Sequence, residues 1–170
     1  GNLNTRNDTE IYVKIHAATE SATKTIRLTN NAASDMMPKI VRNGDKSYLF
    51  WIQNESMIKM VSMNELIGKS IIDNHSVDEM KSGNINVVTT DKLILSDKLT
   101  NIYPFVDDNN NVYIMWQQNS NGVDGATDGE VEFKQDLYVS GLIETADTDG
   151  EIIRSWSKPV RFTNNGKLND

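Results

Sequence analysis

Short apolar runs alternate with polar turns along the whole chain. In residues 160–163 apolar and polar side chains alternate with a period of two, which is typical of a half-buried strand. Similar runs, rich in β-branched and aromatic residues, are separated by Asn/Asp/Gly clusters such as 43–45 and 107–111. The pattern predicts an all-β chain of short antiparallel strands joined by tight turns.

The strand pattern repeats. Residues 25–31 resemble residues 159–165, and residues 93–97 form a looser copy midway, so that consecutive copies lie 67 residues apart. Upstream of the first and last copies stand the similar segments 10–13 and 136–139. A fixed period of this length indicates an architecture built from repeated units.

Each unit also contains a proline and, further on, a tryptophan. Pro38 and Pro104 are 66 residues apart, and Trp51 and Trp116 are 65 residues apart. We therefore expect four strands per unit. The first begins at the proline, where a sheet tolerates a missing N–H, and the second ends on the Trp-Gln pair. The third resembles 136–139, and the fourth resembles 160–163.

Four strands per unit favour a β-propeller, and the main alternative is a set of tandem β-sandwich modules, which need more residues each. The expected fold is roughly two and a half four-stranded antiparallel blades. Residues 8–35 would be the second half of a blade, 36–97 and 98–164 two whole blades, and 165–170 the start of a link to the next. Uncovered blade faces or edges predict self-association.

The stretch 54–83 departs from the pattern. Its methionines fit either one face of a helix or an alternating strand, and we favour a third strand at 57–63 with methionine as core filling. Ser76, with Glu79 three residues on, could cap a short helical turn.

The charge and the absence of cysteine exclude several classes of function. The net charge is −7, from 17 basic and 24 acidic residues, which argues against nucleic acid and anionic membrane surfaces as partners. Without cysteine there can be no disulfide, thiolate nucleophile or cysteine-based zinc site. No apolar run approaches the roughly 20 residues of a membrane span.

One family resemblance rests on four segments, residues 110–117, 136–140, 147–150 and 155–163. Together they resemble a blade of the sialidase-like, Asp-box propellers, whose hairpin between strands three and four carries Ser-x-Asp-x-Gly-x-x-Trp. Thr145, Asp147, Gly150 and Trp156 correspond, with the glycine one residue late and the tryptophan later still. The resemblance implies that Asp147 or Asp149 closes a turn by hydrogen bonds, with Trp156 packed beneath it.

A catalytic site of that family would need three arginines, a tyrosine paired with glutamate, and an acid/base aspartate. Arg27 and Arg161 occupy equivalent repeat positions, which favours a scaffold role. The tyrosines pair in the same way, as Tyr12 with Tyr138 and Tyr48 with Tyr113. The two histidines, at 16 and 75, stand without a serine elbow. We therefore predict no catalytic residues, and the residues expected to be structural are Pro38, Pro104, Trp51, Trp116, Trp156, Arg27 and Arg161.

Two acidic stretches, 124–130 and 147–151, gather oxygen ligands of the kind that Ca²⁺ prefers. Asp147, Asp149 and Glu151 are the candidate ligands. Neither stretch completes an EF-hand loop, so an acidic turn is the simpler interpretation and no cofactor is expected.

These observations lead to a functional hypothesis. The chain would be a non-catalytic propeller region of a larger exported or cell-surface bacterial protein, acting in glycan or protein binding or scaffolding. The alternative is a fragment of a sialidase-like glycoside hydrolase whose active site lies mostly outside this chain.

Overall fold

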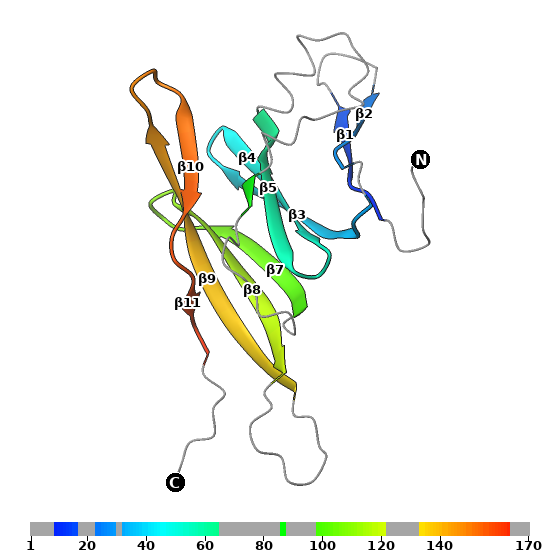
Figure 1. The fold of residues 1–170 in the computed structure, drawn as a ribbon. Coiled ribbons are helices and arrows are strands. Elements are labelled where there is room, and N and C mark those ends of the chain that lie inside the picture. The colour runs from blue at the N-terminus through cyan, green and yellow to red at the C-terminus, as the bar shows by residue number, and fades with distance from the viewer. Residues whose placement is uncertain are drawn as a thin grey trace, which may run out of the picture.

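Three antiparallel sheets follow one another along the chain (Figure 1). The computed structural model describes residues 9–16, 23–29, 32–64, 86–87, 98–121 and 133–163. The first sheet is the hairpin of β1 (Tyr12–His16) and β2 (Thr23–Arg27). The second has the order β3 (Asp35–Asn43), β4 (Lys46–Gln53), β5 (Met57–Ser62) and β6 (Asn86–Val87). The prediction of an all-β, antiparallel chain is confirmed.

The third sheet is the largest. Its order is β10 (Ile152–Trp156), β9 (Phe133–Ala146), β8 (Val112–Asn121) and β7 (Lys98–Val106), and β11 (Val160–Arg161) also pairs with β9. Each expected unit thus contains one sheet, although β3 begins at Asp35, one residue before the expected boundary. In the described part of the chain no helix is long and apolar enough to cross a membrane.

The sequence predicts that each proline begins the first strand of its unit. The structure shows that this prediction is wrong. Pro38 lies inside β3 and Pro104 inside β7. Both strands are edges in the described sheets, since β3 pairs only with β4 and β7 only with β8. An edge strand tolerates an interior proline because one side of its backbone needs no ladder hydrogen bond. Pro38 also falls where the register with β4 shifts, between Met36 and Lys39.

The third and fourth strands of the last unit are longer than predicted. β9 runs for 14 residues, and its partner strand is split into β10 and β11 by residues 157–159. At the break, Ser157 donates its N–H to the carbonyl of Gly141 (2.9 Å), and its hydroxyl oxygen accepts the Gly141 N–H (3.0 Å). Pro159, which follows, has no N–H to continue the ladder.

The ambiguous methionine-rich stretch contains a strand. The preferred third strand at 57–63 is confirmed as β5, which pairs with β4 over its whole length. Its residues Ile58 and Met60 are buried on one face of the sheet, and Val61 on the other. The expected helical turn at Ser76 and the loose repeat copy at 93–97 lie outside the described residues.

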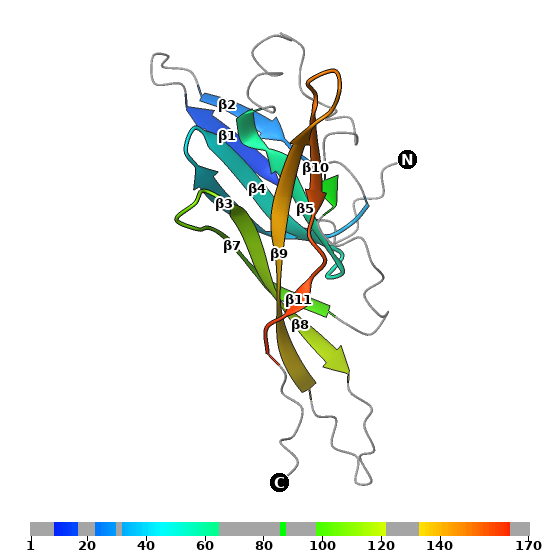
Figure 2. The ribbon, with the colours of Figure 1, turned by 90° about the vertical axis from the view of Figure 1, so that its left-hand side faces the viewer.

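The second sheet is covered on both faces, and β4 supplies both apolar layers. Side chains alternate along a strand, so Tyr48, Phe50 and Ile52 pack toward the third sheet while Leu49 and Trp51 pack toward the first. All five are at most 3% exposed. Figures 1 and 2 show the three sheets stacked in chain order, with β3–β6 in the middle.

Candidate functional site

Arg27 and Arg161 are both bound by carboxylates of their own sheet. Arg27 donates from Nη2 to Oε1 of Glu10 (2.7 Å), and Arg161 donates from Nη2 to Oδ2 of Asp136 (2.7 Å). The hydrogen bond to Asp136 raises the pKa of the Arg161 guanidinium above its usual value. Arg161 therefore links β11 to its neighbour β9, and Arg27 links the end of β2 to Glu10, just before β1.

The backbone around these two ion pairs is also repeated. Tyr12 faces Arg27 across the first sheet, and Tyr138 faces Arg161 across the third. Further equivalent hydrogen bonds run from the N–H of Ile11 and of Leu137 to the hydroxyls of Thr29 and Thr163 (both 2.9 Å), and from the N–H of Leu28 and of Phe162 to the carbonyls of Ile11 and Leu137 (2.8 and 2.7 Å). The β1–β2 hairpin and the β9–β11 pair are thus two copies of one structural unit.

The three tryptophans all lie between sheets. Trp51 donates from Nε1 to buried Asp35 (2.8 Å), and Trp116 stacks on Tyr138 with ring centroids 5.7 Å apart. Trp156 meets Phe50 edge-on at 5.9 Å. It therefore packs on the second sheet, whereas the family resemblance placed it beneath the turn at Asp147.

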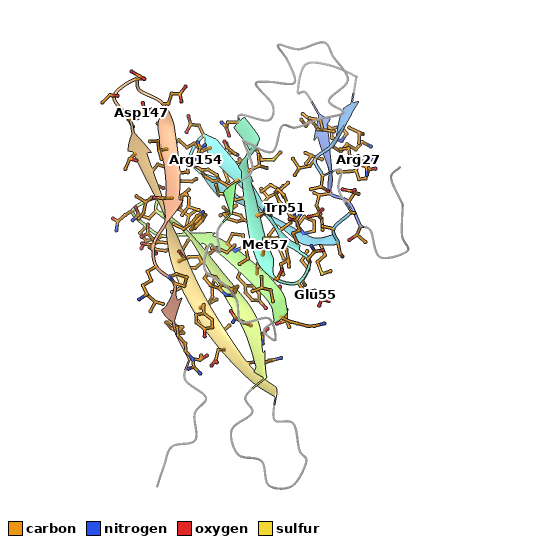
Figure 3. The ribbon with its side chains drawn as sticks, viewed as in Figure 1. Arg27, Trp51, Glu55, Met57, Asp147 and Arg154 are labelled. Carbon is orange, nitrogen blue, oxygen red and sulfur yellow. The ribbon has the colours of Figure 1, made fainter. Side chains whose placement is uncertain are left out.

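A polar cluster that the sequence did not suggest joins the second and third sheets; one of its members, Arg154, is labelled in Figure 3. The Tyr48 hydroxyl donates to Oε1 of Glu144 (3.0 Å), which also accepts from Nε of Arg154 (2.9 Å). Nζ of Lys46 lies 2.7 Å from Oε2 of the same glutamate. Tyr48 and Glu144 are 96 residues apart in sequence, so no local pattern could pair them.

The cluster contains a tyrosine–glutamate pair, Tyr48 with Glu144. Burial, and then the hydrogen bond to Glu144, raises the pKa of Tyr48 to about 12, so the phenol keeps its proton. Burial also acts to raise the pKa of Glu144, but hydrogen bonds from Lys46, Arg154 and Tyr48 outweigh it and hold that pKa below its usual value. Tyr48 is 1% exposed, so the geometry is that of a joint between sheets.

The turns at Asp107 and Asp147 have the same hydrogen bonds. Oδ1 of Asp147 accepts the N–H groups of Asp149 (2.9 Å) and Glu151 (2.8 Å), and Oδ1 of Asp107 accepts those of Asn109 and Asn111 at the same two distances. Asp147 thus closes its turn by hydrogen bonds, as the family resemblance implied for it or Asp149. The hydrogen bonds from Asn111 chiefly lower the pKa of Asp107.

These turns do not assemble a metal site. Oδ1 of Asp147 already accepts two backbone N–H groups, and Asp149 and Glu151 are exposed. Among the described residues, no three acidic or histidine side chains converge in a way that could hold an ion. The second acidic stretch, 124–130, and His75 lie outside the described residues, and His16 is an exposed residue at the end of β1.

The turns nevertheless gather at one end of the stacked sheets. The Asn43 side chain, at the β3–β4 turn, donates to the carbonyl of Asn110 in the β7–β8 turn (2.6 Å). The β9–β10 turn follows Glu144, which is held by Lys46 at the start of β4. We call residues 43–46, 107–111 and 147–151 the turn rim. It presents amide and carboxylate groups on turns that hydrogen bonds close.

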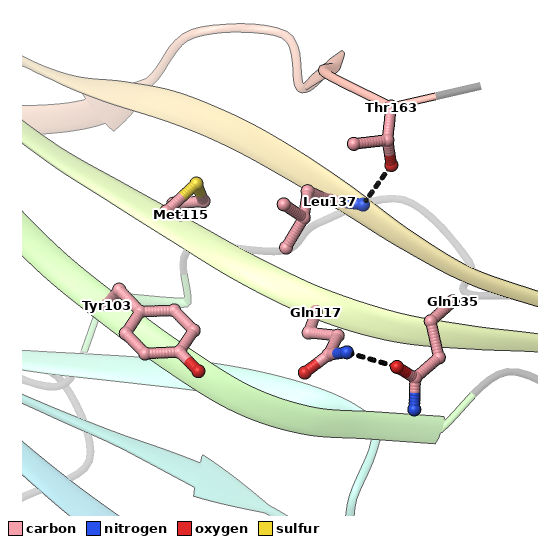
Figure 4. A pocket seen from close by; sticks show the side chains of 6 residues that line it. All are labelled: Tyr103, Met115, Gln117, Gln135, Leu137 and Thr163. Atoms are coloured by element: carbon pink, nitrogen blue, oxygen red, sulfur yellow. Dashed lines mark hydrogen bonds between the residues drawn. The ribbon is translucent and has the colours of Figure 1, made fainter. Parts of the chain in front are cut away.

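A second surface is the face of the third sheet that turns away from the second (Figure 4). It contains a shallow hollow of about 430 Å³, lined by Tyr103, Met115, Gln117, Gln135, Leu137 and Thr163. Nε2 of Gln117 donates to Oε1 of Gln135 (2.5 Å), and Phe105 stacks on Tyr113 beside it at 5.3 Å. The six lining side chains include no carboxylate, imidazole or amine, and their apolar parts suit packing against another surface.

No protein-family model, curated protein or solved structure matches the chain in the comparisons with known proteins.

Proposed function

We propose that the chain forms consecutive blades of a β-propeller in a larger exported or cell-surface bacterial protein, where it acts as a non-catalytic binding scaffold. The observation that supports this most directly is that each sheet packs on the next one with the same face. One face of the first sheet packs on the second, and the corresponding face of the second packs on the third. Radial repetition of four-stranded sheets has this character.

A binding role is supported by the way conspicuous residues are used. The repeated arginines bind carboxylates within their own sheets, and the tryptophans fill the spaces between sheets. The turn rim, by contrast, leaves Asp108 and Asp149 exposed on turns that hydrogen bonds hold in place. Binding sites are commonly carried on loops that a rigid scaffold positions.

The chemistry of the turn rim suits a neutral glycan or a polar protein surface. Amide and carboxylate oxygens accept hydrogen bonds from sugar hydroxyls. The net charge of −7 disfavours anionic ligands by simple repulsion. We therefore propose neutral glycans as the first class of ligand to test.

A glycan array probed with the full chain tests this function. Binding should weaken in Asp108→Ala and Asp149→Ala, because each removes an exposed acceptor from the turn rim. Glu55→Ala is the matched control, since Glu55 lies in the β4–β5 turn at the opposite end of β4, where it pairs with Lys98 (2.7 Å). An array without neutral-glycan signals, or equal losses in all three variants, would refute the proposed ligand surface.

A further inference from the structure

The first and third sheets present the same face to different surroundings. In the first sheet this face carries Ile11, Val13, Ile26 and Leu28, none of which is more than 9% exposed. Their equivalents in the third sheet, by strand register and hydrogen bonding, are Leu137, Val139, Val160 and Phe162. We call this side of each sheet its forward face.

In the third sheet the forward face is open. Val160 is 61% exposed and Phe162 is 73% exposed, whereas their equivalents Ile26 and Leu28 are 1% and 3% exposed. At the other edge of the sheet, β7 extends the apolar surface with Tyr103 and Phe105, each at least 40% exposed. Large side chains kept apolar at such positions commonly mark an interaction surface.

The structure also shows what covers a forward face. The first sheet is covered by Leu49, Trp51, Val61 and Met63 of the second sheet. The forward face of the second sheet is covered in turn by residues of the third, chiefly Ile102, Ile114 and Trp116. In both cases the cover is the opposite face of the next unit, which we call its backward face. On its second strand this face carries a tryptophan two residues after an aliphatic side chain, as in Leu49 and Trp51 or Ile114 and Trp116.

We propose that the open forward face of the third sheet binds the backward face of a further unit of this repeat. The partner is an antiparallel sheet whose second strand carries the aliphatic-x-Trp pattern of Leu49 and Trp51. The tryptophan of that strand would fill the hollow at Tyr103 and Met115, as Trp51 fills the space over the first sheet.

A second copy of this chain does not offer such a face among its described residues. The backward faces of its second and third sheets are already covered by the sheets before them. The backward face of its first sheet carries exposed Tyr12, Lys14 and Thr25, a poor match for an apolar surface. The repeat unit is therefore the better partner.

The test extends the full chain by one unit and uses a thiol as reporter. A second copy of residues 36–97 is added after Asp170, because β4 and β5 of this unit pack on the equivalent face of the first sheet. The natural chain has no cysteine, so Val160→Cys reports on the forward face. Thr148→Cys, on the exposed tip of the β9–β10 turn, is the matched control.

Reaction with a thiol reagent should be rapid at both positions in the unextended chain. In the extended chain, we expect labelling at position 160 to slow by about tenfold or more, because the stacked sheets must open before the thiol reacts, while position 148 is unchanged. Replacing the added tryptophan, the counterpart of Trp51, with serine should restore rapid labelling, and circular dichroism checks that each extended chain adds strand signal.

Equal labelling at position 160 with and without the added unit would overturn the proposal, whether both rates are fast or both are slow. Protection that persists after the tryptophan is replaced would overturn it as well. The proposal rests on the stacking of sheets that the proposed propeller also uses, but not on the turn-rim ligand. A blank glycan array would therefore leave it standing.

Discussion

Truncating equivalent residues in the first and third sheets should have very different effects on stability. Leu28 and Phe162 donate the same backbone hydrogen bond, to Ile11 (2.8 Å) and Leu137 (2.7 Å) respectively. Their side chains differ in cover, being 3% and 73% exposed. A comparison of Leu28→Ala with Phe162→Ala thus isolates the contribution of the sheet that packs on the first.

The magnitudes follow from burial. Replacing a buried leucine with alanine costs about 2–5 kcal/mol, from lost transfer energy and the cavity that remains. We expect about 3 kcal/mol for Leu28→Ala, and a change within about 0.5 kcal/mol for Phe162→Ala, as for other surface substitutions. Phenylalanine is the larger side chain, so side-chain size alone predicts the opposite order.

Urea unfolding followed by circular dichroism measures both effects. With a slope of about 2 kcal/mol per molar urea, Leu28→Ala should lower the midpoint by about 1.5 M and leave the slope unchanged. Phe162→Ala should leave the midpoint within about 0.3 M of the parent chain. Equal losses, or a larger loss for Phe162→Ala, would refute the reasoning that one face is covered and its equivalent open.

Three other substitutions test the joints and turns. Glu144, whose pKa is lowered in the folded chain, contributes stability above its unfolded pKa that is lost as the pH falls through the folded value. Glu144→Gln should therefore cost roughly 1–2 kcal/mol at neutral pH and flatten the decline in melting temperature below about pH 4.5, and an unchanged acid profile would contradict this. Asp35→Ala removes the acceptor of the Trp51 indole and should lower the free energy of unfolding, measured by urea titration, by about 2–3 kcal/mol. The control Asp45→Ala, at an exposed position, should change it very little, and similar losses in both variants would contradict the role of Asp35 as a buried anchor. Gly150 has a φ of +80° with open space around it, so Gly150→Ala should cost about 1 kcal/mol in calorimetry through backbone strain alone, and a stabilised variant would exclude that strain.

The molecule has two surfaces that suit different kinds of partner. The turn rim is polar and is held by hydrogen bonds between sheets, as between Asn43 and Asn110. The forward face of the third sheet is apolar and repeats positions that are buried elsewhere in the chain. The polar turn rim is better suited to a ligand that binds reversibly. The apolar forward face is better suited to a permanent structural neighbour.

Much of the architecture was predictable from the spacing of residues along the chain. A segment in which apolar and polar side chains alternate is typical of a strand with two different faces. A pattern that recurs along the chain predicts a recurring structural unit. The equivalence of Arg27 and Arg161 therefore predicts a scaffold role for both. In the structure the two arginines bind Glu10 and Asp136. These carboxylates are buried or half-buried and therefore require a charged or hydrogen-bonding partner.

The tertiary structure decided which faces are covered and which distant side chains meet. The prolines sit inside strands because β3 and β7 are edges, a property that belongs to the sheet and not to the local sequence. Tyr48 and Glu144 meet across two sheets, 96 residues apart. The contrast between buried Leu28 and exposed Phe162 has the same origin, since burial depends on what packs against a face, and equivalent sequences can have different neighbours.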